Sequence, residues 1–483
     1  MKYFLFALLL ILAVVVLLIC VAVIKAVTNK KTVSDKKAAI SWTKEEEAEY
    51  AHCLSEMVKV PTLSKKKGED YSEFLKLQTV MSELFPNIFT KLEAHHIDGN
   101  MLFRWAGKDS SKEGILLMGH QDVVPAEEKE WENDPFSGLI EDGVVKGRGA
   151  MDCKSTLCAE FAAVEELLKE GFVPERDVWL ASSVNEENSG GGAETLVEYL
   201  LSKGIRLSCV MDEGGAVMEN AFPGLEVPCA AIGLVEKGFV NLKIIARGKG
   251  GHASTPPKNT PIVRLSKFIC EVEKSEPFTK AYTSPIPEMF DSIAPYMTFP
   301  LRLVLSNMWL FKGVVKKVLP MLSSMGGAFL STTCAFTMSD GSSAPNVLPD
   351  YAYVICNIRP SVHQNAEESV AVLREIAKKY DLEVEVMFSR DASNTSSMDS
   401  KEYAYLKKCL NECFPDVVVT PYLMTGGTDC RQFERVCDNC LRFTPTRLTN
   451  QQLAAMHAAN ENIGVSALAE AVKFYRYFIE KQS

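Results

Sequence analysis

The run Gly114-Ile-Leu-Leu-Met118 is short and apolar, which predicts a buried β-strand. Between Leu157 and Leu168 the apolar residues recur at helical spacing, and Gly171 follows as a residue that commonly ends helices. Asp177-Val-Trp-Leu-Ala-Ser-Ser-Val184 predicts a second strand, and Ser208-Cys-Val-Met211 a third. Strands that alternate with helices predict an α/β fold, in which helices cover both faces of a mostly parallel sheet.

Farther along the chain, the elements follow a different order, β-α-β-β-α-β. They are predicted at Phe239–Arg247, Pro261–Glu273, Thr332–Met338, Tyr351–Ile358, Glu367–Tyr380 and Leu382–Phe388. This order predicts a ferredoxin-like α+β domain inserted into the first domain, whose strand and helix signals resume from Tyr403. The apolar stretch Pro285–Leu330 interrupts the inserted domain. It is interpreted either as additional packed helices or as a contact to a lipophilic substrate or a membrane.

The N-terminus carries an uninterrupted apolar stretch of 22 residues, Tyr3–Ile24. As a helix it would span roughly 33 Å, enough to cross a bilayer. Its length and the absence of a small-residue cleavage site favour a single-pass membrane anchor over a cleaved signal peptide. Lysines follow it at Lys25, Lys30 and Lys31, which favours a cytoplasmic body, although such anchors also deliver domains outward. The sequence leaves the side of the membrane open.

Composition narrows the choice of partners. The 483 residues carry a net charge of −10, which argues against a nucleic-acid surface. The fourteen cysteines have no regular spacing, so no disulfide framework is predicted. Cys437-x-x-Cys440 lacks a second pair, and Ser189-Gly-Gly-Gly192 lacks the Lys-Ser/Thr of a phosphate loop.

Polar side chains gather where the predicted strands end. His120 and Asp122 follow the first strand, Glu186 and Glu187 the second and Asp212 the third, while Asp152 precedes the helix. Alone, each has an ordinary structural explanation, such as a buried histidine or a solvated acidic pair. However, the carboxyl ends of parallel strands share one edge of a sheet. So many carboxylates together need cations, and a site of histidine and carboxylate suits Zn²⁺ or a similar ion.

Further motifs fall in one order along nearly the whole chain after the N-terminal stretch. They are Met118-Gly-His-Gln-Asp-Val-Val-Pro125, Asp134-Pro-Phe-Ser-Gly138, Gly147-Arg-Gly-Ala-Met-Asp152, Asn185-Glu-Glu187, Met211-Asp-Glu-Gly-Gly215, Gly250-Gly-His-Ala-Ser254, Pro345-Asn346, Asn357-Ile-Arg-Pro360, Thr425-Gly-Gly-Thr-Asp429 and Met456-His457. The set resembles the two-zinc metallopeptidase family of aminoacylase, carboxypeptidase S, acetylornithine deacetylase and succinyl-diaminopimelate desuccinylase. The first and fifth motifs are most similar to the branch of carboxypeptidase S and the N-fatty-acyl-amino-acid synthase/hydrolase.

The resemblance implies two divalent metal ions, most simply Zn²⁺, with Co²⁺ or Mn²⁺ as alternatives. The implied ligands are His120, Asp152, Glu187, Asp212 and His457, with Asp152 bridging both ions. It further implies that Glu186 is the general base acting on a metal-bridging water and that Asp122 supports the imidazole of His120. The implied contacts to the substrate and its oxyanion are His252, Asn346, Arg359 and the backbone near Gly427. The bond Asp152–Cys153 is expected to be cis.

This likeness implies a zinc-exopeptidase-like α/β domain carrying a lid that dimerises. The implied reaction is hydrolysis of an amide, releasing a C-terminal amino acid from a small peptide or an N-acyl amino acid. Residues 1–37 would be the anchor and linker, 38–238 and 392–483 the two parts of the catalytic domain, and 239–391 the lid. The chain departs from the family pattern at Cys153 and Asn185, where relatives often carry Asp. The alternative is an inactive, metal-bearing binding protein with the same fold, although none of the expected residues is lost.

Overall fold

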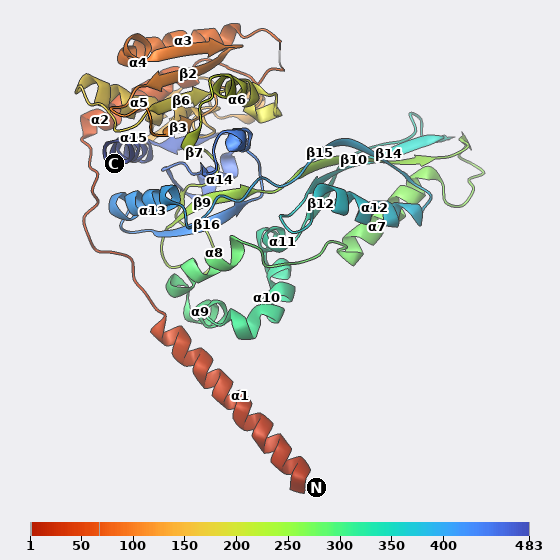
Figure 1. The fold of residues 1–483 in the computed structure, drawn as a ribbon. Helices are drawn as coiled ribbons and strands as arrows, with labels where there is room; N and C mark the ends of the chain where they lie inside the picture. The colour runs from red at the N-terminus through yellow and green to blue at the C-terminus, as the bar shows by residue number, and fades with distance from the viewer. Residues whose placement is uncertain (1, 67, 483) are drawn as a thin grey trace.

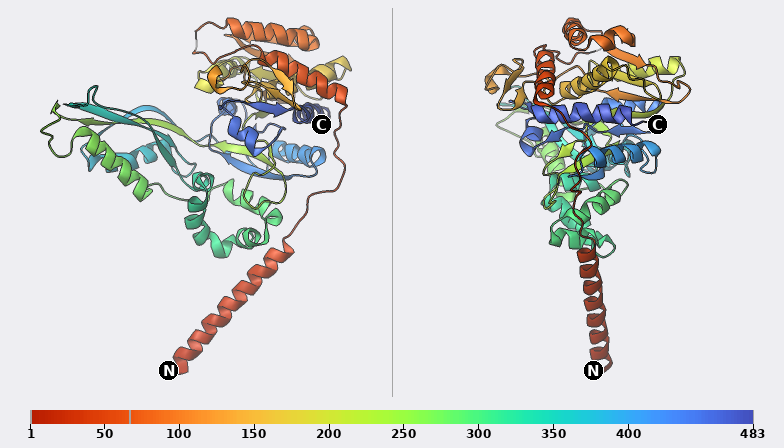
Figure 2. Two further views of the ribbon diagram at one scale, coloured as in Figure 1. Left: turned by 180° about the vertical axis from the view of Figure 1, so that it is seen from behind. Right: turned by 90° about the vertical axis from the view of Figure 1, so that its left-hand side faces the viewer.

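The computed structural model describes residues 2–66 and 68–482 and has three visible parts. Figure 1 shows a layered α/β body, an arm that projects from it, and a long helix, α1 (Lys2–Thr28), that leads away from the body. Figure 2 shows the arm and α1 leaving the body in different directions.

The body is built on a central sheet in the order β1-β2-β6-β3-β7-β17-β9-β8-β18, with β16 paired to β9. Its strands are β1 (Glu93–Ile97), β2 (Asn100–Trp105), β3 (Gly114–Met118), β6 (Val178–Ser182), β7 (Leu207–Asp212), β8 (Val217–Met218), β9 (Cys229–Glu236), β16 (Val418–Met424), β17 (Cys440–Arg442) and β18 (Arg447–Leu448). The neighbours β6, β3, β7 and β17 run parallel, while β1, β2 and β6 pair antiparallel. The predicted mostly parallel sheet is confirmed, and β3, β6 and β7 end at one edge.

Helices cover both faces of this sheet because its strands are apolar on both sides. On one face lie α2 (Lys44–Val58), α3 (Ser72–Leu84), α4 (Pro86–Lys91), α5 (Lys154–Lys169), α13 (Lys401–Cys413) and α15 (Val465–Glu480). On the other face lie α6 (Gly192–Ser202) and the 3-10 turn η4 (Asp429–Arg435). The predicted helix between Leu157 and Leu168 is α5. It begins directly after Asp152 and Cys153, and therefore fixes both against the sheet edge.

Short elements complete the body. A small sheet of β4 (Leu139–Glu141), β5 (Val144–Lys146) and β19 (Asn462–Gly464) brings the loop before Asp152 close to the loop that carries His457. The other short helical elements of the body are η1 (Glu128–Glu130), η2 (Glu186–Asn188) and α14 (Asn450–Ala455). Each of the fourteen cysteines is a free thiol.

The arm is the predicted ferredoxin-like domain. Its elements are β10 (Phe239–Arg247), α7 (Pro261–Ser275), β12 (Thr333–Asp340), β14 (Tyr351–Arg359), α12 (Ala366–Lys378) and β15 (Glu383–Arg390). The antiparallel order β12-β14-β10-β15 is that of a split βαβ fold. The two helices pack on one face of this sheet around a separate apolar core. A two-stranded ladder, β11 (Gly251–His252) with β13 (Val347–Leu348), extends it.

The apolar stretch Pro285–Leu330 packs on the body, although the sequence grouped it with the arm. It forms α8 (Ile286–Ile293), η3 (Ala294–Tyr296), α9 (Phe299–Leu305), α10 (Met308–Leu322) and α11 (Ser324–Leu330). Its buried side chains, among them Phe290 and Phe329, join Val235 of β9 and Leu423 of β16 in one apolar cluster. The prediction of additional packed helices therefore describes its inner face.

Helix α1 is long and apolar enough to cross a membrane, by length and composition, and its side chains are almost all exposed. A signal sequence near an N-terminus would pass the same test. The C-terminal turns of α1 contact α9, so Ala22 and Ala26 are buried there.

Candidate active site

A cavity of about 320 Å³ opens where β3, β6 and β7 end. Its ionisable lining consists of four predicted site residues, Asp152, Glu186, Glu187 and His457, together with Glu213. The loop after β16 forms another part of the wall and includes Gly427. Far-apart segments of the chain therefore meet in one site, as the strand order requires.

Asp152 lies between two histidines. Its Oδ1 is 3.0 Å from Nε2 of His120, and its Oδ2 is 3.0 Å from Nε2 of His457. Each carboxylate oxygen thus faces a different imidazole, which makes Asp152 a candidate for a shared metal ligand. The peptide bond Asp152–Cys153 is cis, which confirms that prediction.

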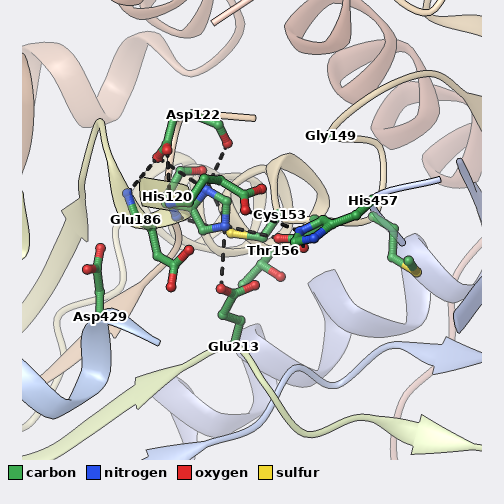
Figure 3. A network of polar contacts seen from close by, with 12 residues as sticks. His120, Asp122, Gly149, Cys153, Thr156, Glu186, Glu213, Asp429 and His457 are labelled. Atoms are coloured by element: carbon green, nitrogen blue, oxygen red, sulfur yellow. Dashed lines mark hydrogen bonds and ion pairs between the residues drawn. The ribbon is translucent and has the colours of Figure 1, made fainter. Parts of the chain in front are cut away.

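Two more carboxylates lie close to these histidines. Oε1 of Glu213 is 3.4 Å from Nε2 of His120, and Oε2 of Glu187 is 3.1 Å from Nε2 of His457. Figure 3 shows Glu213 facing His120. Among the described residues, Oε1 of Glu187 is buried and has no hydrogen-bond partner. An orphaned buried oxygen within a set of imidazoles and carboxylates fits a divalent cation.

Asp212, the ligand that the resemblance implied for the first ion, lies outside both clusters. Its Oδ1 accepts the backbone N–H of Glu213 at 2.8 Å, and its Oδ2 accepts that of Cys430 at 2.7 Å. Both oxygens are therefore engaged in fixing the loops after β7 and before η4. The geometry therefore offers the neighbouring Glu213 as a second candidate ligand, and the assignment of Asp212 stays a prediction.

Asp122 holds three parts of the site together. Its Oδ1 accepts the N–H of Glu186 and its Oδ2 accepts the N–H of Glu187, each at 3.1 Å. The backbone oxygen of Asp122 lies 2.8 Å from Nδ1 of His120, while its carboxylate is farther away, at 3.4 Å. Asp122 therefore contacts His120 mainly through its backbone, and its side chain positions the Glu186-Glu187 turn (Figure 3).

The electrostatics of the site reflect crowded buried carboxylates. Burial, followed by the nearby charge of Asp152, raises the pKa of Glu213 to about 8. Burial also raises the pKa of Glu186 well above its usual range. The pKa of His457 rises to about 10 through its hydrogen bonds to Asp152 and Glu187. Positive charge placed between these groups would offset the crowding, which agrees with a site for cations.

Cys153 is the position where relatives often carry Asp. Its Sγ belongs to the cluster of His120, Asp152 and Glu213, and it accepts the backbone N–H of His120 at 3.1 Å. Burial raises the pKa of this thiol well above its usual range, so it is held in the protonated form, a weak metal ligand.

Two predicted site residues lie on the arm, away from the cavity. His252 is exposed on β11. The N–H of Ala253, the residue after His252, donates to the carbonyl of Asn346 at 3.0 Å. His252 and Asn346 are therefore near each other, but neither lines the cavity. Arg359 ends β14 at the base of the arm, with its guanidinium 4.4 Å from the ring centroid of Phe239.

Comparison with known proteins shows the family to which the chain belongs. Residues 116–481 match the family described as Peptidase family M20/M25/M40. The chain belongs to this peptidase family. The N-fatty-acyl-amino acid synthase/hydrolase of Xenopus tropicalis is 31% identical over 90% of this chain and 86% of that protein. Carboxypeptidase S of Saccharomyces cerevisiae is 27% identical over 88% of this chain and 83% of that protein.

Solved structures of the peptidase family share the fold. A metallo-carboxypeptidase from Sulfolobus solfataricus superposes with a TM-score of 0.65 at 19% identity, covering 89% of this chain and 98% of that one. Human carnosine dipeptidase 1 gives a TM-score of 0.62 at 16% identity, covering 90% and 97%.

The structure adds residues to the site of this peptidase-family member that the sequence did not single out. Glu213 was not predicted as a ligand because it is adjacent to Asp212 at the end of β7. The sequence spacing does not show which of these two side chains faces the cavity. Glu461 is fully buried and holds the loop that carries Asp152. Arg390 ends β15, and its Nη2 lies 3.5 Å from where a Cβ on Gly427 would stand. No sequence motif marks Glu461 or Arg390.

Proposed function

We propose that this chain hydrolyses the amide bond between an apolar acyl or peptidyl group and a C-terminal amino acid, with two divalent metal ions at Asp152. The observation that carries the proposal is the position of the two carboxylate oxygens of Asp152, each 3.0 Å from a different histidine. A carboxylate shared in this way is typical of two-metal hydrolases. The names of the similar proteins, a carboxypeptidase and an N-fatty-acyl-amino acid synthase/hydrolase, support the same kind of bond.

The ligand sets follow from the clusters. His120, Asp152 and Glu213 would hold one ion, and Asp152, Glu187 and His457 the other. When bound, the ions would polarise the amide carbonyl and make a water molecule more acidic. Nitrogen and oxygen ligands of this kind fit Zn²⁺, and they also accept Co²⁺ or Mn²⁺.

Glu186 is the proposed general base. It lines the cavity beside the ligands without belonging to either cluster, and Asp122 fixes its backbone. A carboxylate at this place can take a proton from the attacking water as the new C–O bond forms. It then returns the proton to the nitrogen as the C–N bond breaks.

Arginines at the base of the arm are the proposed receptors for the free carboxylate of the substrate. Arg359 and Arg390 lie on β14 and β15, which pair with β10 on opposite sides near Phe239. Among the described residues, Nε of Arg390 is buried without a hydrogen-bond partner, and Gly427, close to its guanidinium, lines the cavity. An arginine fork with an unused donor suits a carboxylate.

The acyl or peptidyl group is assigned to the apolar wall of the cavity. This wall consists of Met151, Ala216, Met218, Leu448 and Leu453, which form one apolar cluster. No residue of the stretch Pro285–Leu330 is among the residues that line the cavity in the described part of the chain. Recognition of an apolar group is therefore assigned to the sheet edge rather than to that stretch.

His252 and Asn346 are proposed to serve the cavity of a second copy of the chain. Both lie on the arm and are exposed, while the groups that would develop negative charge in the reaction lie in the body. A two-fold dimer formed through the arms would make such a contact twice, once for each cavity. In that arrangement His252 would donate to the oxyanion.

A substrate screen of the full-length protein tests the proposal. Purified protein with its metal content measured is incubated with dipeptides and with acetyl, octanoyl and oleoyl amino acids. We expect amino-acid release that rises with acyl length, by up to about fourfold for each buried methylene, equivalent to about 0.8 kcal/mol. A metal-replete protein that binds these compounds without cleaving any of them would favour the alternative, an inactive binding protein. A rate independent of acyl length would remove the apolar wall from substrate recognition.

A further inference from the structure

Helix α10 exposes an apolar face that the body leaves uncovered. Leu310, Val314, Val318 and Met321 follow one another at helical spacing on this outer face. The exposed fractions reach 56% at Val314 and 83% at Met321. Trp309 lies in the first turn of the same helix and is 54% exposed. So much contiguous apolar surface is characteristic of an interaction site.

The charge of this region differs from that of the whole chain. From Phe299 to Leu330 the sequence contains Arg302, Lys312, Lys316 and Lys317 and no acidic residue, whereas the chain carries a net charge of −10. An apolar face flanked by lysines and an exposed tryptophan is the pattern of a helix that lies in a membrane interface. It suits the surface of an anionic phospholipid bilayer.

Side chains of the same region bind the end of α1. Nδ2 of Asn307 donates to the backbone oxygen of Ala22 at 2.9 Å, and Nε of Arg302 donates to that of Ala26 at 3.0 Å. Asn307 and Arg302 are both buried. The carbonyl of Ala26 lies in the last turn of α1, where a helix has no partner of its own. These bonds fix the direction in which α1 leaves the body.

This attachment sets the depth of α9 and α10 relative to a bilayer. The apolar part of α1 ends at Ile24, and Asn307 and Arg302 contact the helix on either side of that residue. If α1 crosses a bilayer, its contact with α9 therefore lies where the hydrocarbon gives way to headgroups. Figure 1 shows α9 and α10 on the side of the body from which α1 departs, and Figure 2 agrees from other directions.

We propose that the outer face of α9 and α10 rests in the interface of the bilayer that α1 spans. The inference rests on α1 being retained as an anchor. A phospholipid surface is favoured over a second copy of the chain because the face adjoins α1 and is basic and apolar. On its inner side the same stretch contacts the cavity wall: the rings of Phe329 and Tyr422 lie 5.7 Å apart, and Tyr422 lines the cavity.

Photocrosslinking of the full-length chain in vesicles of phosphatidylcholine and phosphatidylserine tests the proposal. A benzophenone amino acid replaces Val314 or Met321 on the outer face, and Leu12 within α1 as the reference for lipid contact. Met338 and Met387 of the arm, which are 59% and 53% exposed, are the matched controls. The measurement is the mass of the adduct after illumination. It does not depend on catalysis, so it stands apart from the proposed hydrolase activity.

We expect phospholipid adducts at positions 314 and 321 in yields comparable to position 12 and at least about tenfold above the controls, because a benzophenone labels only what it touches. Yields at 314 and 321 equal to those of the arm would overturn the proposal. So would adducts to a second copy of the chain in place of lipid, since the face would then be a protein interface. Absence of lipid adducts at position 12 would also overturn it, because α1 would not lie in the bilayer.

Discussion

The backbone N–H of Asp152 donates to Oε1 of Glu461 at 3.0 Å, which joins the residue at the centre of the candidate site to one near the C-terminus. The same carboxylate accepts the N–H groups of Met151 at 2.8 Å and Gly149 at 3.1 Å. It also pairs with the guanidinium of Arg148 at 2.7 Å. Glu461 is fully buried and paired with Arg148, so it acts as an internal anion around which the loop that carries Asp152 is folded.

We therefore expect Glu461→Gln to weaken metal binding although Glu461 is not a ligand. An amide presents N–H donors where the loop also presents donors, so the loop must shift. Loss of such a supporting residue typically lowers metal affinity about 10- to 100-fold. Competition with a chelator measures this metal affinity. Glu470→Gln, which removes a carboxylate paired with Arg447, is the matched control and should leave the affinity unchanged. Equal affinity in both variants would contradict the role of Glu461.

A comparison of Glu213→Gln with Asp212→Asn decides which of the two adjacent acids is a ligand. Glu213→Gln should lose one of two metal ions, because a ligand within 3.4 Å of His120 is neutralised. Asp212→Asn should retain both, since its oxygens accept backbone N–H groups. Metal content after dialysis is the measurement, and Asp152→Ala, which removes the shared ligand, should lose both ions. Loss of metal in Asp212→Asn alone would identify Asp212 as the ligand instead.

Glu186→Gln should keep both metal ions and lower turnover by about 10² to 10⁴, the usual contribution of a positioned proton-transfer group. Burial raises the pKa of Glu186, and a base must be unprotonated to act. The wild-type rate should therefore fall as the pH falls through that pKa, and the variant should lack this acid limb. A metal-replete variant that keeps the wild-type rate and pH profile would remove Glu186 from this role.

Arg390→Met should raise KM for substrates with a free carboxylate by about 10- to 100-fold, because one charge-assisted hydrogen bond is worth about 1.5–3 kcal/mol. The kcat value should change little, since the carboxylate is held equally in the ground state and the transition state. The control is the same substrate with its carboxylate converted to an amide. Its KM should be the same for the wild type and for the variant. If the variant also impairs the amide substrate, Arg390 supports the fold of the site rather than the carboxylate.

The sequence predicted the fold well because each predicted element has a strong local signal. The elements of the arm, from Phe239–Arg247 to Glu383–Arg390, lie within a few residues of the predicted ranges. The sheet edge likewise follows from strands that are apolar along their whole length. The packing of Pro285–Leu330 could not be predicted, because an apolar stretch does not encode which partner covers it.

The sequence motifs indicated which residues belong to the site, but not how their side chains are oriented. Asp152, His120, Glu187 and His457 were expected together, and the structure brings them together. The choice between Asp212 and Glu213 depends on which side chain the end of β7 turns toward the cavity. Arg390 and Glu461 act through contacts between segments far apart in the chain, which no local pattern records.

His252 should act on the cavity of a second subunit. It lies at the end of the arm, beyond the last residue of β10, while the candidate ligands and Glu186 lie in the body. His252→Ala should therefore lower the rate by about 10² to 10³, the usual cost of one oxyanion donor, with metal content unchanged. Alone, this loss would not reveal whether the histidine acts within its own chain.

Mixing two impaired proteins, Glu186→Gln and His252→Ala, makes that distinction. They are unfolded and refolded together, and each alone is refolded as a control. In a mixed dimer, the subunit that carries His252→Ala still has its own Glu186 and receives an intact His252 from its partner. Random pairing makes about half of the dimers mixed, each with one complete site, so about a quarter of the wild-type activity should return. A mixture no more active than its components would mean that His252 serves its own chain or has no catalytic role, because exchange of subunits could then complete no site.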